Sequence, residues 1–195
     1  MKYPQLIVIA FTLALLLPAV HAASMQYTFT GSGSGSLAGA DFADSAFAIV
    51  GHADPANVTT CLAGCRSLEF AAASISIAGL GDFSFSSPLR VFNNLGNLGL
   101  SRGGIGGADL FSAFLVPADY DFASALGPVL GLVGLFQWQG ELFGDVLTSG
   151  GVLVFNDRDA DTEGSFRAQG VPLPGAVWLL ASALLAGTVL GRRRG

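Results

Sequence analysis

Residues 25–30 read MQYTFT, with an apolar side chain at every second position and polar side chains between them. Successive side chains of a β-strand point to opposite faces, so this alternation predicts a strand with one buried face. The same period of two recurs in SISI (74–77), FSFS (83–86) and FQWQ (136–139), and further strands are predicted at residues 152–155 and 165–168. Many short alternating segments are typical of an all-β chain.

Stretches rich in glycine, asparagine and proline separate these segments and predict turns. They lie at residues 31–35, 53–57, 79–82, 93–97, 103–107 and 150–151. We interpret GSGSGS (31–36) as a loop, because it lacks the glycine spacing and the following helix of a dinucleotide site. The apolar run 126–136 is interrupted by Pro128 and three glycines, so we predict a buried strand there. The pattern predicts a mainly β fold, with a β-sandwich or jelly-roll-like body.

The charges of this 195-residue chain are few and unevenly placed. Only 12% of residues are charged and 51% are hydrophobic, which excludes a simple disordered chain. All 14 acidic residues lie between Asp41 and Glu163, and with five arginines they give the middle a net charge of −9. That charge excludes nucleic acid as a partner, since binding it requires a basic surface.

The N-terminal residues 1–22 have the parts of a secretory signal peptide. Lys2 supplies the positive start, and residues 6–17 form an apolar stretch too short to span a bilayer. Small residues lead up to Ala22, after which we predict cleavage by signal peptidase. The alternative is an uncleaved anchor. If the signal peptide is removed, residues 23–169 form the exported domain.

The C-terminal residues 170–195 predict a membrane-associated tail. Residues 175–191 contain no charge and would reach about 25 Å as a helix, the short end of a membrane span. Arg192, Arg193 and Arg194 follow as a basic stop, which would keep the tip of the tail in the cytoplasm. A core helix of a soluble domain is the alternative, but the segment has no polar face for solvent.

The order Pro-x-Pro, short apolar span and arginine cluster in residues 171–194 resembles the PEP-CTERM sorting signal of Gram-negative bacteria. The resemblance implies export, a membrane-anchored intermediate and processing by exosortase, a membrane-embedded cysteine protease. The protein would then reach the cell surface or the exopolysaccharide matrix. Val171, Pro172, Leu173 and Pro174 would form the recognition motif. Leu173 stands where the family usually has Glu, so we expect slower cleavage, and a plain uncleaved anchor is the alternative.

Two features of the middle of the chain suggest local chemistry. Cys61 and Cys65 are the only cysteines, and two cysteines in an exported protein predict a disulfide.

Four acidic residues occupy alternate positions, namely Asp157, Asp159, Asp161 and Glu163. On an extended strand their side chains would share one face. Such an oxygen cluster is a speculative calcium site, although the EF-hand pattern is not met. A solvated acidic loop is the alternative.

Catalytic motifs are not apparent in this sequence. After removal of the signal peptide His52 is the one histidine, and we expect it to be a solvated loop residue. We therefore predict a non-enzymatic exported protein without a cofactor. One alternative is an extracellular carbohydrate- or calcium-binding module on an uncleaved anchor. Another is a secreted hydrolase that uses a carboxylate pair such as Asp119 and Asp121.

Overall fold

The computed structural model describes residues 24–103, 109–114, 116–133, 137–138, 144–156 and 163–171. This part of the chain is mainly β, as predicted, and consists of antiparallel strands with one short 3₁₀ turn, η1 (Pro55–Asn57). Within it, no helix combines the length and the apolarity that crossing a membrane requires. Ala22, Pro172, Leu173, Pro174, Arg192, Arg193 and Arg194 lie outside the described residues, as do the predicted signal peptide and membrane segment.

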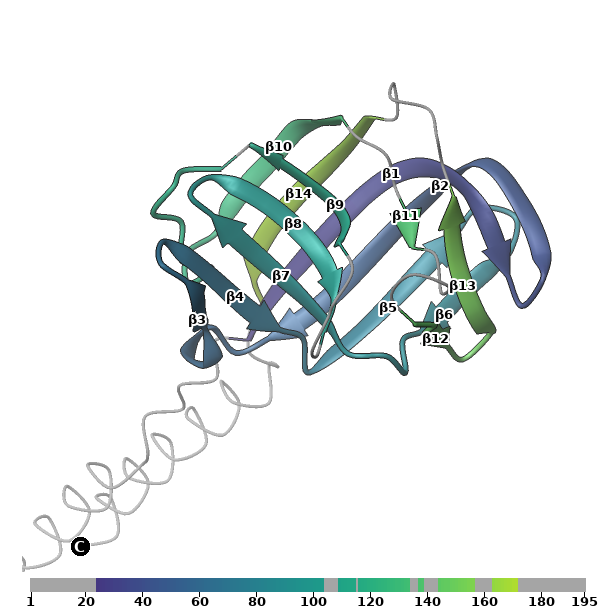
Figure 1. The fold of residues 1–195 in the computed structure, drawn as a ribbon, viewed down its shortest axis with the longest axis horizontal. Coiled ribbons are helices and arrows are strands. Elements are labelled where there is room, and N and C mark those ends of the chain that lie inside the picture. The colour runs from purple at the N-terminus through teal and green to yellow at the C-terminus, as the bar shows by residue number, and fades with distance from the viewer. Residues whose placement is uncertain are drawn as a thin grey trace, which may run out of the picture.

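The larger of two sheets has nine strands (Figure 1). Its main path runs β10 (Leu126–Val133), β14 (Glu163–Gly170), β1 (Met25–Leu37), β2 (Ala40–Ala53), β5 (Ala72–Ile77) and β6 (Gly81–Ser84). The remaining strands are β13 (Gly151–Asn156), which pairs with β1, and its neighbours β11 (Gln137–Trp138) and β12 (Val146–Thr148). The strands predicted at residues 25–30, 74–77, 152–155 and 165–168 are all confirmed.

The smaller sheet has five strands, and in Figure 1 its strands pass across β14 and β1. They run in the order β3 (Thr59–Leu62), β4 (Cys65–Glu69), β7 (Leu89–Asn94), β8 (Asn97–Arg102) and β9 (Asp109–Phe114). Inward side chains of both sheets form one hydrophobic cluster, which includes Tyr27, Phe29, Phe166, Leu68, Val91 and Leu100. The alternation of MQYTFT therefore predicts the buried face correctly, since Met25, Tyr27 and Phe29 all point into this core.

One end of the larger sheet curls until its strands close into a ring. Along one side β1 pairs with β2, and along the other it pairs first with β14 and then with β13. The opposite edge is joined by a bridge between Phe85 and Thr148, next to a hydrogen bond of 2.8 Å from Ser149 N to Ser84 O. Strands β1, β2, β5, β6, β12 and β13 thereby form a continuous circuit.

The interpretation of GSGSGS as a loop is wrong, because residues 31–36 lie inside β1. The glycines at positions 33 and 35 face the interior of the ring and make room for aromatic side chains. A Cβ on Gly33 would lie 3.3 Å from the ring of Phe155, and one on Gly35 would lie 2.9 Å from Phe42 Cζ. A β-bulge between these two glycines also bends the strand. Inward glycine leaves no apolar side chain in the sequence, so the alternation is invisible there.

Two further predictions need correction. The run 126–136 is predicted to be a buried strand, but among the described strands β10 pairs with β14 alone, and Leu130 is 73% exposed. This edge position suits Pro128, which lacks the N–H that a second neighbouring strand would need. His52 is not in a loop: it lies in β2, half-buried, opposite Gln26 on one side and Ala72 on the other.

Candidate functional site

The two ends of the described body lie side by side in the larger sheet. Met25 at the start of β1 pairs with Gly170 at the end of β14. One residue further out, Val171 N donates a hydrogen bond of 2.8 Å to Ser24 O. Gln169 Nε2 donates to Gln26 Oε1 at 3.3 Å on the next pair inward. Val171, the first residue of the predicted sorting motif, is thus held against the start of the body.

Buried aromatic side chains fix the register of this terminal strand pair. Phe29 and Phe166 lie opposite each other, fully buried, with ring centroids 4.9 Å apart. Tyr27 is buried beside them and stacks on Phe70 at 5.7 Å. A slip of one residue would turn these rings to the solvent, so the pairing that holds Val171 is strongly specified.

A loop of residues 116–125 covers the core next to these rings. Tyr27 donates its hydroxyl hydrogen to Phe122 O at 2.7 Å, and Tyr120 donates to Ser124 O at 3.1 Å. Burial raises the pKa of both tyrosine hydroxyls well above its ordinary value. Phe122 is fully buried with a φ of 66°, a left-handed conformation that is costly for a bulky residue. The packing around the loop must offset that cost.

Asn93, from β7, is the side chain that holds this loop in place. Its Nδ2 donates to the carbonyls of Pro117 at 3.1 Å and Tyr120 at 2.9 Å, and its Oδ1 accepts from Gly96 N at 2.8 Å. Asn93 is 1% exposed, so every polar atom of the amide needs such a partner. The sequence indicated only a turn at residues 93–97.

The carboxylates considered for a hydrolase, Asp119 and Asp121, are exposed on the same loop. Asp121 Oδ1 accepts a hydrogen bond from Ala123 N at 3.0 Å, and its carboxylate lies 3.9 Å from the Arg66 guanidinium. Arg66 also donates to the backbone carbonyl of Asp119 at 3.1 Å. These contacts give Asp121 a structural role in shaping the loop.

The structure joins Cys61 of β3 to Cys65 of β4 by a disulfide, with the Cα atoms 5.3 Å apart. The two residues flank the hairpin turn, in which Gly64 adopts a φ of 78°. Cys61 is exposed and Cys65 is buried. The bond closes a very short loop, so chain entropy predicts a contribution of about 2 kcal/mol.

The speculative calcium site cannot be built from the described residues. Asp157, Asp159 and Asp161 lie outside them, and Glu163 is placed only as the first residue of β14, opposite Val133. Among the residues that the structure describes, no group of three or more His, Cys, Asp or Glu side chains is arranged to hold a metal ion. Calcium binding by this acidic run stays a prediction.

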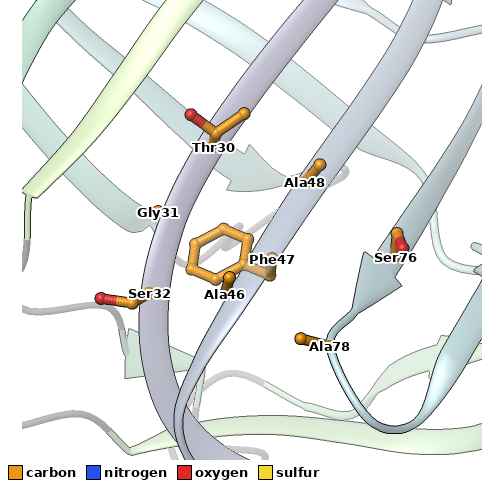
Figure 2. Close-up of a pocket in the computed structure, with 8 residues that line it drawn as sticks. All are labelled: Thr30, Gly31, Ser32, Ala46, Phe47, Ala48, Ser76 and Ala78. Atoms are coloured by element: carbon orange, nitrogen blue, oxygen red, sulfur yellow. The ribbon is translucent and has the colours of Figure 1, made fainter.

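An open hollow lies on β1, β2 and the end of β5 (Figure 2). It has a volume of about 600 Å³ and is lined by Thr30, Gly31, Ser32, Ala46, Phe47, Ala48, Ser76 and Ala78. None of these lining residues is charged. The hydroxyl of Thr30 also pairs with Ser165 Oγ at 2.7 Å. The hollow offers hydroxyl groups and methyl groups to an uncharged molecule, without an acid, base or nucleophile pair.

The sequence did not reveal that Ser24 and Val171 are hydrogen-bonded or that Asn93 anchors a distant loop. Both contacts join segments far apart in the chain, and neither has a local sequence signature. The chain matches no protein-family model, and no curated protein or solved structure matches it.

Proposed function

We propose that this protein is a non-enzymatic exported protein, which a PEP-CTERM-type tail sorts to the cell surface or the exopolysaccharide matrix. A signal peptide is removed after Ala22, and residues 23–169 form a β-sandwich-like exported domain. The tail, residues 170–195, anchors an intermediate in the inner membrane. An exosortase-type protease then reads Val171, Pro172, Leu173 and Pro174.

One observation supports this proposal above the others: the body closes on itself just inside both predicted cleavage points. The hydrogen bond from Val171 N to Ser24 O joins its first and last described residues. The outermost buried side chains at this end are Met25 and Ala168. Of the described residues, Ser24 and residues 169–171 contribute no buried side chain to the core. Processing at both ends is compatible with a stable mature domain.

The sequence of the tail supports processing rather than anchoring alone. Proline fixes its own φ and restricts the residue before it to extended conformations, so Pro172 and Pro174 favour an extended backbone. Proteases bind extended backbone, and an apolar segment that starts at residue 175 would hold it at the membrane surface. The basic stop Arg192, Arg193 and Arg194 keeps the end of the tail on the cytoplasmic side.

The proposal is tested by changing the prolines in a host that contains exosortase. We expect Pro172→Ala with Pro174→Ala to leave a full-length form in the membrane fraction, while the wild type is shortened and released. Leu173→Glu should speed release, because it restores the acidic residue of the motif. Ala176→Ser is a matched control in the same tail and should behave as the wild type. Release of the double variant at the wild-type rate would show that the motif is not read.

The hollow on the larger sheet favours a second function, binding of a neutral carbohydrate by a body that stays on an uncleaved anchor. The hydroxyl groups of Thr30, Ser32 and Ser76 line it without any charge. Binding of the purified protein to a glycan array, with and without calcium, tests this function. Ala48→Asp would place a charge in the hollow and should abolish binding there, whereas Ala72→Asp, at an exposed position outside the hollow, should not.

A further inference from the structure

We infer that the pairing of residues 24–26 with residues 169–171, which we call the terminal latch, must open before a protease can cut the chain at the sorting motif. This inference rests on the proposed function, because it concerns the regulation of the same motif. It makes processing of the tail depend on a local opening of the folded body.

The terminal latch occupies the start of the sorting motif. The N–H of Val171 is already donated to Ser24 O, at 2.8 Å. Next to it, Met25 pairs with Gly170, and the side chains of Gln26 and Gln169 are hydrogen-bonded at 3.3 Å. A protease that binds extended substrate on both sides of the cut bond would compete with β1 for this backbone.

The sequence limits the backbone donors of the motif beyond Val171. Pro172 and Pro174 have no N–H, so Leu173 is the one motif residue after Val171 that could donate to a neighbouring strand. The prolines therefore leave the motif a single backbone donor beyond Val171, which is itself paired with Ser24.

The terminal latch should open more easily than the rest of β14. Gly170 is exposed, and Gln169 and Val171 are half-buried, whereas Phe166 and Ala168 are fully buried in the core. Separation of residues 169–171 breaks backbone hydrogen bonds but leaves the core side chains in place. Terminal segments of this kind open locally without global unfolding. The rate of cleavage would then be proportional to the population of the open form.

Cross-strand disulfides test the latch directly. Gln26→Cys with Gln169→Cys would lock it, since these residues lie directly opposite each other. Thr30→Cys with Ser165→Cys is the matched control on the same two strands: its pair also lies directly opposite, with the side-chain oxygens 2.7 Å apart, and it leaves residues 169–171 free to open. Mass spectrometry of tryptic peptides verifies that each bond has formed.

The rate of tail removal is followed by pulse-chase in a host with exosortase, before and after dithiothreitol. We expect the locked variant to be cut at least about tenfold more slowly than the wild type, and to recover with dithiothreitol. The Thr30–Ser165 variant should be cut at the wild-type rate under both conditions. Cutting of the oxidised, locked variant at the wild-type rate would overturn the latch.

A second arm uses purified full-length protein and a broad-specificity protease, with cuts in residues 169–174 located by mass spectrometry. The latch predicts the same tenfold protection of the oxidised, locked variant at residues 169–171, and equal cutting of both variants there would overturn it. If the wild type keeps its tail in the host, the proposed function fails, and this arm still decides whether the latch shields the backbone.

Discussion

At the scale of single residues, buried polar side chains decide how the loop of residues 116–125 sits on the core. The side-chain amide of Asn93 donates hydrogen bonds to the carbonyls of Pro117 and Tyr120 and accepts one from the N–H of Gly96. Tyr27 satisfies the carbonyl of Phe122. Because these groups are buried, loss of either side chain leaves backbone atoms without a partner.

Replacement of Asn93 by Ala should therefore lower the free energy of unfolding by about 3 kcal/mol, since several buried groups lose their partner at once. Urea unfolding of the purified protein measures this. Asn94→Ala, at the exposed neighbouring position, should change stability by less than about 0.5 kcal/mol. Equal stability of the two variants would contradict the anchoring role of Asn93.

The two buried tyrosines predict an alkaline limit of stability. Burial raises the pKa of Tyr27 and of Tyr120, so the folded state holds these protons more tightly than the unfolded state does. The stabilising effect is complete below the ordinary tyrosine pKa of about 10 and is lost as the pH rises above it. Lys2, the one lysine, lies in the predicted signal peptide, so no lysine of the body complicates this range.

Urea unfolding of the mature protein between pH 8 and pH 11.5 tests the effect. The free energy of unfolding of the wild type should fall above pH 10. That of a Tyr27→Phe, Tyr120→Phe variant should be lower at pH 8 but change less with pH. A wild-type curve that is flat to pH 11.5 would show that the hydroxyls do not titrate as inferred.

At the scale of elements, β1 organises the fold, since it pairs with β2 over its length and with β14 and β13 in turn.

The second half of β1 depends on glycines that face the interior of the ring. Gly35→Ala would bring a Cβ against Phe42 and the carbonyl of Val154, and we expect a loss of about 2–3 kcal/mol. Ser36→Ala, on the outer face, should have little effect in the same thermal or urea unfolding experiment. Tolerance of Gly35→Ala would refute the close packing of the ring.

The β3–β4 hairpin carries a prediction of its own. Under non-reducing conditions, the peptide that contains Cys61 and Cys65 should be lighter than the reduced peptide by the mass of two hydrogen atoms. Cys61→Ser with Cys65→Ser should cost about 2 kcal/mol of stability. Two alkylatable thiols in protein isolated from the periplasm would contradict the bond.

The sequence predicted those parts of the fold in which apolar and polar residues alternate. The alternation of Tyr27 and Phe29 with polar residues predicts a buried face, and so does that of Ile75 and Ile77; all four side chains are buried. The closure of the ring could not be predicted, because the bridge between Phe85 and Thr148 joins residues that are far apart in the chain. The loop predicted at residues 31–36 was wrong for a related reason, since an inward glycine has no side chain and shows no apolar alternation in the sequence.

At the scale of the whole molecule, the first and last described residues, Ser24 and Val171, lie together at one end of the larger sheet. The predicted signal peptide and the predicted sorting tail therefore join the body at adjacent residues, Ser24 and Val171. The basic residues Lys2, Arg192, Arg193 and Arg194 lie beyond these junctions, whereas the acidic residues all lie between them. This arrangement favours an exported body that is attached to the membrane from one end.

We propose that two different proteases remove the terminal segments from an intact body. Intact-mass analysis of the protein from an exosortase-containing host and from an otherwise identical host without exosortase tests this proposal. We predict a chain that begins at Ala23 in both hosts, and that ends within residues 171–174 only where exosortase is present. A chain that retains residues 175–195 in both hosts would contradict the proposal and identify the tail as a plain membrane anchor.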